Sequence, residues 1–132
     1  MPVNSYLLAG LKTNPALAID LICRYSLAKE NRPKLFDSLK KNMSKANADV
    51  FYGDLSACSK LDLTADIGKI NAPAQVICGL EDKMTPADFS RGIASGLTGA
   101  KLCLIAGAGH MVMLEKPAEF NEALVKFVAA IS

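Results

Sequence analysis

Two short, largely apolar runs, residues 74–78 and 101–105, most constrain how this chain of 132 residues can fold. Each run is followed by a glycine-containing turn, a pattern that is typical of strands in a parallel sheet covered on both faces. The first turn presents Asp82, and the second presents His110, 28 residues later. Because neighbouring parallel strands end at the same edge of a sheet, we expect the two side chains to meet, with Asp82 orienting and charge-stabilising His110.

A helix is predicted between these strands and another after them. Residues 85–88 have a capping-box arrangement, with the hydroxyl of Thr85 at the N-cap and proline at the first position. This helix should run to about Leu97 and stop near Gly99. Pro117 begins the final helix, whose apolar residues share one stripe: Phe120, Leu124, Phe127, Val128 and Ile131. The second half of the chain is therefore predicted to be a strand-helix-strand-helix unit.

The first half of the chain is predicted to contain helices without strands. Asn14 followed by Pro15 is typical of a helix start, Pro33 opens a second helical segment, and a short helix is expected over residues 51–58. The residues expected to face inward recur at helical spacing: Ala18, Leu21, Ile22 and Tyr25, then Leu35, Phe36, Leu39 and Met43. This organisation is typical of a lid rather than of a sheet-bearing core.

The composition is that of a globular protein, with 51% hydrophobic and 21% charged residues. No apolar run approaches the ~18 residues of a membrane span, and the start lacks a signal-peptide pattern, so we expect a cytoplasmic protein with no membrane partner. The cysteines are widely spaced among apolar neighbours, which indicates small buried hydrophobes rather than disulfides or zinc ligands: Cys23, Cys58, Cys78 and Cys103. One histidine and no clustered carboxylates argue against a metal site, and no cofactor is implied.

Positive charge is concentrated in residues 29–45, which hold six basic and two acidic side chains. Such a segment is either a docking surface for an anionic substrate or nucleic acid, or a solvated helix face. Because no aromatic or glycine-rich nucleic-acid motif accompanies the lysines, we favour the solvated face and expect no nucleic-acid partner.

His110 is the only histidine of the chain, and it follows glycines that allow the backbone to project its ring into a cleft. Asp82 has a second interpretation as a residue that stabilises a turn or the next helix N-terminus. Asp88 is a rival carboxylate, but its capping position already explains it. Glu115 is expected to anchor the loop or the helix start rather than to do acid-base chemistry.

No serine or cysteine of the chain occupies a nucleophile elbow of the G-x-S-x-G type. Residues 92–96 look superficially similar, but Ser95 comes one place late and falls within a predicted helix. Aromatic and methionine side chains of the first half could line a substrate pocket under the lid, although packing is the commoner role of such residues: Tyr25, Phe36, Met43, Phe51 and Tyr52.

From about Asp54 to Ser132 the sequence resembles the alpha/beta-hydrolase family. The matching segments read DLSAC at 54–58, INAP at 70–73, VICG at 76–79, DKMTP at 82–86, GAGHM at 107–111 and LEKP at 114–117. Members of that family place the triad acid in the Gly-x-x-Asp turn and the triad histidine in the Gly-His turn. The resemblance implies that Asp82 and His110 are the second and third triad members. It also implies that residues 1–66 form a helical cap and residues 67–132 the C-terminal part of the catalytic core.

The resemblance implies an α/β class with a partial alpha/beta-hydrolase fold, and a hydrolase of a small-molecule ester, lactone or similar carbonyl substrate. The nucleophile and the oxyanion hole are expected in sequence that precedes Met1, so the chain alone is expected to be inactive. Two alternatives stay open: a non-catalytic, self-associating binding module, or the same fold with dehalogenase, C–C bond hydrolase or cofactor-free oxygen chemistry. Without preceding strands, the open sheet edge predicts a homo-oligomer.

Overall fold

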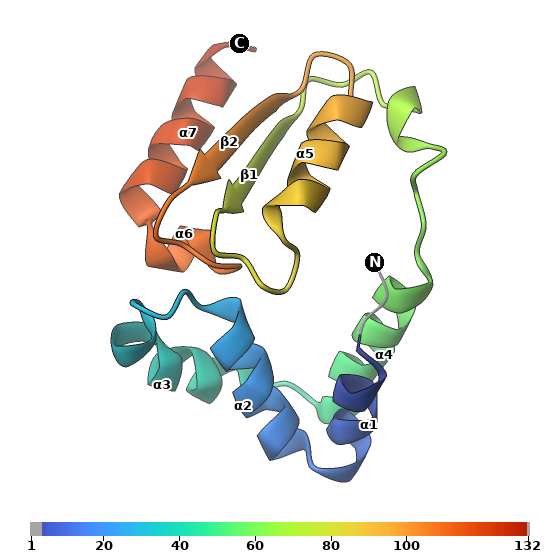
Figure 1. Cartoon of the computed structure of the whole chain (residues 1–132), viewed down its shortest axis with the longest axis vertical. Helices are drawn as coiled ribbons and strands as arrows, with labels where there is room; N and C mark the ends of the chain where they lie inside the picture. The colour runs from blue at the N-terminus through green and yellow to red at the C-terminus, as the bar shows by residue number, and fades with distance from the viewer. Residues whose placement is uncertain (1–3, 132) are drawn as a thin grey trace.

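The computed structural model describes residues 4–131 and confirms the predicted α/β class, with a helical first half followed by a short parallel sheet (Figure 1). Within these residues, no helix combines the length and the hydrophobicity that a membrane crossing requires. The elements follow in the order α1 Ser5–Thr13, α2 Pro15–Ser26, α3 Arg32–Met43, α4 Ala48–Lys60, a 3-10 turn at Ile67–Lys69, β1 Gln75–Gly79, α5 Ala87–Gly96, β2 Lys101–Ile105, α6 Val112–Glu115 and α7 Pro117–Ala129.

The sheet consists of β1 and β2, which run parallel with Gln75 opposite Lys101 and Gly79 opposite Ile105. Helices α5 and α7 lie on opposite sides of it, and both strands point toward the helices of the first half (Figure 1). The two turns that follow the strands therefore lie at the junction between the sheet and the helical part.

Helices α1 to α4 share a core of their own. Asparagine side chains accept backbone N–H groups at the start of three of them, since Asn4 caps α1, Asn14 caps α2 and Asn47 caps α4. The buried residues of this core are Leu11, Ala18, Ile19, Ile22, Cys23, Leu27 and Leu39. Met84 and Met111, from the turns after the two strands, also pack against it, so these turns are attached to the helical part.

The helical part differs from the sequence-based expectations in four respects. Helix α1 was not predicted, and α4 extends beyond residues 51–58 at both ends. In α2, Leu21 and Tyr25 were expected to face inward, but they are 40% and 53% exposed. Helix α2 instead buries Ile19 and Cys23, because α1 and α3 both contact it and together define its inner face. Cys58 was expected to be buried and is exposed on α4.

The two faces of the sheet are more exposed than the continuous apolar sequence of its strands predicts. Leu102 of β2 is 37% exposed, so the expectation that both faces are fully buried is wrong for this strand. On α7 the predicted stripe is also partly open, with Leu124 42%, Val128 50% and Ile131 51% exposed. The physical reason is that two strands and two helices form too small a layer to cover both sides of an apolar stripe.

Candidate active site

The turn after β1 carries Asp82, and it is braced against the turn after β2. The backbone N–H of Glu81 donates to the carbonyl of Ala108 at 2.9 Å, and that of Asp82 donates to the carbonyl of Gly79 at 3.2 Å. Gly79 passes so close to the second turn that an added Cβ would lie 2.3 Å from the carbonyl oxygens of Ala108 and Gly109. The glycine is thus required for the approach that brings the two turns together.

The turn after β2 carries His110 and is fastened to the end of α2. Gly107 adopts a φ of 69°, a left-handed conformation that L side chains rarely adopt, and this bends the chain out of β2. The backbone N–H groups of His110 and Met111 both donate to the carbonyl of Ser26, at 2.9 and 3.2 Å. The position of His110 therefore depends on β2 and on the end of α2 together.

Asp82 and His110, the two residues proposed from the sequence, lie in direct contact. The Nδ1 atom of His110 is 2.9 Å from Oδ2 of Asp82. The Asp82 side chain is only 5% exposed, whereas the His110 side chain is 38% exposed. Because an ionised carboxylate can only accept hydrogen bonds, Nδ1 carries the proton and Nε2 is left as the acceptor.

Asp82 also has its other acceptor positions filled. Its Oδ1 atom accepts the backbone N–H groups of Met84 and Thr85, both at 2.8 Å, and Oδ2 accepts the hydroxyl of Thr85 at 2.8 Å. The turn-stabilising role considered from the sequence is therefore present, on Oδ1, while Oδ2 holds the imidazole. One carboxylate fixes both the turn and the ring.

Thr85 has a different role from the one expected. It was predicted to be the N-cap of the following helix, but α5 begins at Ala87 with Pro86 at its N-cap and with no side-chain capping bond. The Thr85 hydroxyl instead donates to Asp82 and lies 3.2 Å from Nδ1 of His110. A hydrogen bond to a charged carboxylate is stronger than a cap on neutral N–H groups, which explains the outcome. The spacing of three residues between Asp82 and Thr85 is the one sequence signal that could have indicated this role of Thr85.

The other candidates lie away from this pair. Asp88 has a 96% exposed side chain and contacts Arg91 at 3.7 Å. Ser95 is exposed on α5, where its hydroxyl donates to the carbonyl of Gly92. Among residues 4–131 no serine or cysteine side chain hydrogen-bonds the ring of His110, and no cluster of three or more potential metal ligands occurs.

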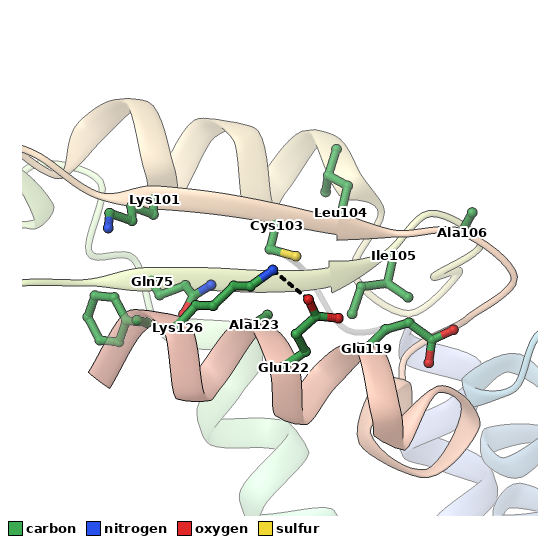
Figure 2. A pocket seen from close by; sticks show the side chains of 11 residues that line it. Gln75, Lys101, Cys103, Leu104, Ile105, Ala106, Glu119, Glu122, Ala123 and Lys126 are labelled. Atoms are coloured by element: carbon green, nitrogen blue, oxygen red, sulfur yellow. Dashed lines mark hydrogen bonds and ion pairs between the residues drawn. The ribbon is translucent and has the colours of Figure 1, made fainter. Parts of the chain in front are cut away.

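A hollow of about 530 Å³ lies between β2 and α7, away from the Asp82–His110 pair (Figure 2). Its walls carry the ion pair between Lys126 and Glu122, and neither Asp82 nor His110 lines it. We therefore locate the candidate site by the contact between the two side chains and not by cavity size.

A second hollow of about 300 Å³ lies beside the Asp82 turn. It is lined by Leu21, Arg24, Tyr25, Arg32 and Lys83. Of the aromatic and methionine residues considered as pocket lining, only Tyr25 borders it, whereas the others pack on the helical core: Phe36, Met43, Phe51 and Tyr52.

Comparisons with known proteins show which sequences and structures this chain resembles. No family model matches the sequence. A thermophilic esterase is 37% identical, and the match covers 99% of this chain and 52% of that structure with a TM-score of 0.87. The enol-lactonase of Burkholderia xenovorans LB400 has the same fold, with a TM-score of 0.85 at 20% identity.

Curated relatives agree with the structures. A 2-hydroxy-6-oxononadienedioate/2-hydroxy-6-oxononatrienedioate hydrolase of Klebsiella pneumoniae is 28% identical over 72% of this chain, and a putative carbamate hydrolase RutD of Variovorax paradoxus is 31% identical over 59%. The chain spans 34% and 29% of these two relatives and about half of the solved structures. The chain has a partial alpha/beta-hydrolase fold, and the proteins it resembles are alpha/beta hydrolases.

Proposed function

We propose that Asp82 and His110 are the acid and the base of a hydrolase triad that acts on an ester, lactone or similar carbonyl substrate. The observation that carries the proposal is the 2.9 Å contact between Asp82 Oδ2 and His110 Nδ1, at the ends of two neighbouring parallel strands. In this chemistry Nε2 of His110 takes the proton of the nucleophile and returns it to the leaving group. Asp82 holds the correct tautomer and stabilises the imidazolium that forms.

The proposal assigns the nucleophile and the oxyanion hole to polypeptide outside residues 1–132. The support is that these residues contain no G-x-S-x-G segment and that the chain spans about half of its structural neighbours. An acid-base pair without a nucleophile cannot form an acyl-enzyme. Residues 1–132 alone should therefore neither hydrolyse p-nitrophenyl esters nor react with a fluorophosphonate probe. Saturable turnover with covalent labelling of Ser95 or another serine would contradict this assignment.

A chimera tests the acid-base role directly. Residues 1–132 replace the matching half of the thermophilic esterase, whose own nucleophile is retained. We expect ester hydrolysis that is abolished by His110→Ala, with the unsubstituted chimera as the reference and circular dichroism as the check on folding. A folded His110→Ala chimera with unchanged turnover would contradict the proposal.

We further propose that residues 1–66 act as a cap and residues 67–132 as part of the catalytic core. The support is that the buried residues form two clusters. One lies among α1, α2 and α3, and the other is centred on Ile105, at the end of the second strand, and on Ala108 and Val112 after it. Brief proteolysis should cut the connecting residues 61–66 first and leave both parts protected. Early cutting inside α2 or β2 would contradict the division.

A second candidate reaction is C–C bond hydrolysis of a carboxylate-bearing substrate. The observation that favours it is the 300 Å³ hollow beside the Asp82 turn, whose walls include three cationic side chains, Arg24, Arg32 and Lys83. Of these, Arg24 is ion-paired with Asp20 at 2.6 Å. The Klebsiella relative is named for a substrate that carries two carboxylates. Competition in the chimera tests the anion site on which this candidate depends: succinate should inhibit ester hydrolysis if the hollow binds anions, and Lys83→Gln should then weaken the inhibition.

The proposal includes a cytoplasmic location, a small-molecule substrate and self-association of the chain. Apolar side chains on α7 and the open edges of the two-stranded sheet support the last of these, since exposed apolar surface is disfavoured in water and unpaired strand edges recruit partners. The same features would serve a non-catalytic module, which is one of the alternatives left open by the sequence. Activity of the chimera distinguishes the two, because a module that has lost its chemistry would give a folded but inactive protein.

A further inference from the structure

Glu115 is a buried carboxylate with a full set of hydrogen-bond donors. The residue is 8% exposed and lies on α6, five residues after His110. Its Oε1 atom accepts the backbone N–H of Gly109 at 2.8 Å, and its Oε2 atom accepts the backbone N–H of Ala28 and the side-chain amide of Asn31, each at 2.8 Å. A carboxylate suits this position, because three N–H donors converge on it and an ionised carboxylate only accepts hydrogen bonds.

These bonds join two segments that are far apart in the sequence. Ala28 and Asn31 belong to the loop between α2 and α3, whereas Gly109 immediately precedes His110 in the turn after β2. Asn31 reinforces the connection, since its side-chain amide also donates to the carbonyl of Gly107 at 2.8 Å. The loop of the helical part and the histidine turn are thus held by the same carboxylate.

The bond to Gly109 lies next to the backbone of His110. The N–H of His110 is held by the carbonyl of Ser26 at 2.9 Å, so consecutive peptide groups of this turn are fixed, one by Glu115 and the next by the end of α2. Two consecutive fixed peptide groups leave little freedom for the direction in which the Cα–Cβ bond of His110 points. The direction of this bond decides whether Nδ1 meets Asp82.

We propose that Glu115 is a positioning residue that orients the His110 ring toward Asp82 and couples this orientation to the α2–α3 loop. A displacement of that loop would pull on Glu115, shift the peptide at Gly109 and turn the imidazole away from the carboxylate. The coupling concerns the geometry of the histidine, and only its consequence for catalysis rests on the proposed function.

The experiment uses the fact that His110 is the only histidine, so its ring resonances need no assignment by mutation. The chain is labelled with 15N in the imidazole, and the ratio of the Nδ1–H to the Nε2–H tautomer is measured by NMR above the titration of the ring. Glu115→Gln keeps the size of the side chain but turns an NH2 group toward an N–H donor, which breaks one side of the network. We expect the Nδ1–H to Nε2–H ratio to fall by about tenfold, the effect of losing a charge-assisted hydrogen bond.

The matched control is Glu119→Gln, which changes an exposed glutamate of α7 and should leave the ratio unchanged. If Glu115 has a merely structural role, Glu115→Gln lowers the melting temperature and leaves the tautomer ratio at the wild-type value, and this result would overturn the proposal. Should Glu115→Gln fail to fold, Asn31→Ala decides, because it removes the contacts of the Asn31 amide with Glu115 and Gly107 and retains the bonds that Glu115 accepts from Ala28 and Gly109. A lowered ratio in Asn31→Ala supports the coupling, and an unchanged ratio overturns it. The readout needs no activity, so its failure is distinguishable from failure of the hydrolase proposal.

Discussion

Gly79 and Ala108 cross so closely that a Cβ atom on Gly79 would lie 2.3 Å from the carbonyl oxygen of Ala108. Gly79 ends β1 and Ala108 lies in the turn after β2. Their close approach therefore joins the turn that carries Asp82 to the turn that carries His110. The backbone bond from Glu81 to Ala108 lies at the same crossing, at 2.9 Å. The geometry of the Asp82–His110 pair thus depends on the absence of a side chain at position 79.

Gly79→Ala should therefore be severely destabilising. Because backbone atoms and not flexible side chains obstruct the new methyl group, we expect a loss of about 3 kcal/mol in the free energy of unfolding. Urea denaturation measures it. The control is Gly92→Ala on α5, where nothing lies within 4 Å of an added Cβ, and where alanine should stabilise the helix by roughly 0.5–1 kcal/mol. If Gly79→Ala and Gly92→Ala change the free energy of unfolding equally, the close approach of Gly79 to Ala108 is contradicted.

Thr85→Val should weaken the turn that carries Asp82. Valine keeps the shape of threonine but removes the hydroxyl that donates to Asp82 Oδ2 at 2.8 Å. We expect a loss of about 1 kcal/mol in the free energy of unfolding, measured by urea denaturation. Thr85→Ser retains the hydroxyl and should recover most of the loss. If valine and serine behave alike, the hydroxyl has no part in holding the carboxylate.

The cysteines should differ sharply in reactivity. Burial raises the pKa of the Cys23 thiol, and this residue is 0% exposed, whereas Cys58 is exposed on α4. A raised pKa leaves a smaller thiolate fraction at pH 8, and the thiolate is the reactive form. Iodoacetamide should thus modify Cys58 in the native protein and reach Cys23 only after unfolding, as followed by peptide mass spectrometry. Native labelling of Cys23 at the rate of Cys58 would contradict the helical core described above.

Self-association is the prediction for the exposed apolar face of α7. Leu124 and Val125 are 42% and 65% exposed, and the sheet beside them has open edges. Sedimentation at micromolar concentration should show a concentration-dependent increase in mass, which Val125→Lys should reduce. The exposed position Asn121 on the same helix provides the control, Asn121→Lys, with the same added charge and no loss of apolar surface. A stable monomer at all concentrations would refute the prediction.

The parts of the fold that could be predicted from the sequence are those decided by local chemistry. The runs that became β1 and β2 are apolar and end in glycine turns, so both strands and the meeting of Asp82 with His110 follow from periodicity and parallel topology. Asn14 caps α2 and Pro117 is the first residue of α7, so the starts of both helices also follow from the local sequence.

The features that could not be predicted depend on tertiary contacts. The inner face of α2 is set by α1 and α3 together, so Ile19 is buried while Tyr25 is exposed, although both are apolar. Thr85 looks like a helix cap until the carboxylate of Asp82 lies within reach of its hydroxyl. Two of the three donors to Glu115, at Ala28 and Asn31, lie more than eighty residues away in the chain, and no local pattern connects them to it.

The most direct test of the acid-base proposal is the kcat of the chimera for a p-nitrophenyl ester after Asp82→Asn. An amide cannot hold the Nδ1–H tautomer or stabilise the imidazolium, so kcat should fall by about 10⁴ while the fold is retained. The matched control is Asp88→Asn, which removes a neighbouring carboxylate that is 96% exposed, and it should leave kcat unchanged. A folded Asp82→Asn chimera with the kcat of the unsubstituted chimera would contradict the account.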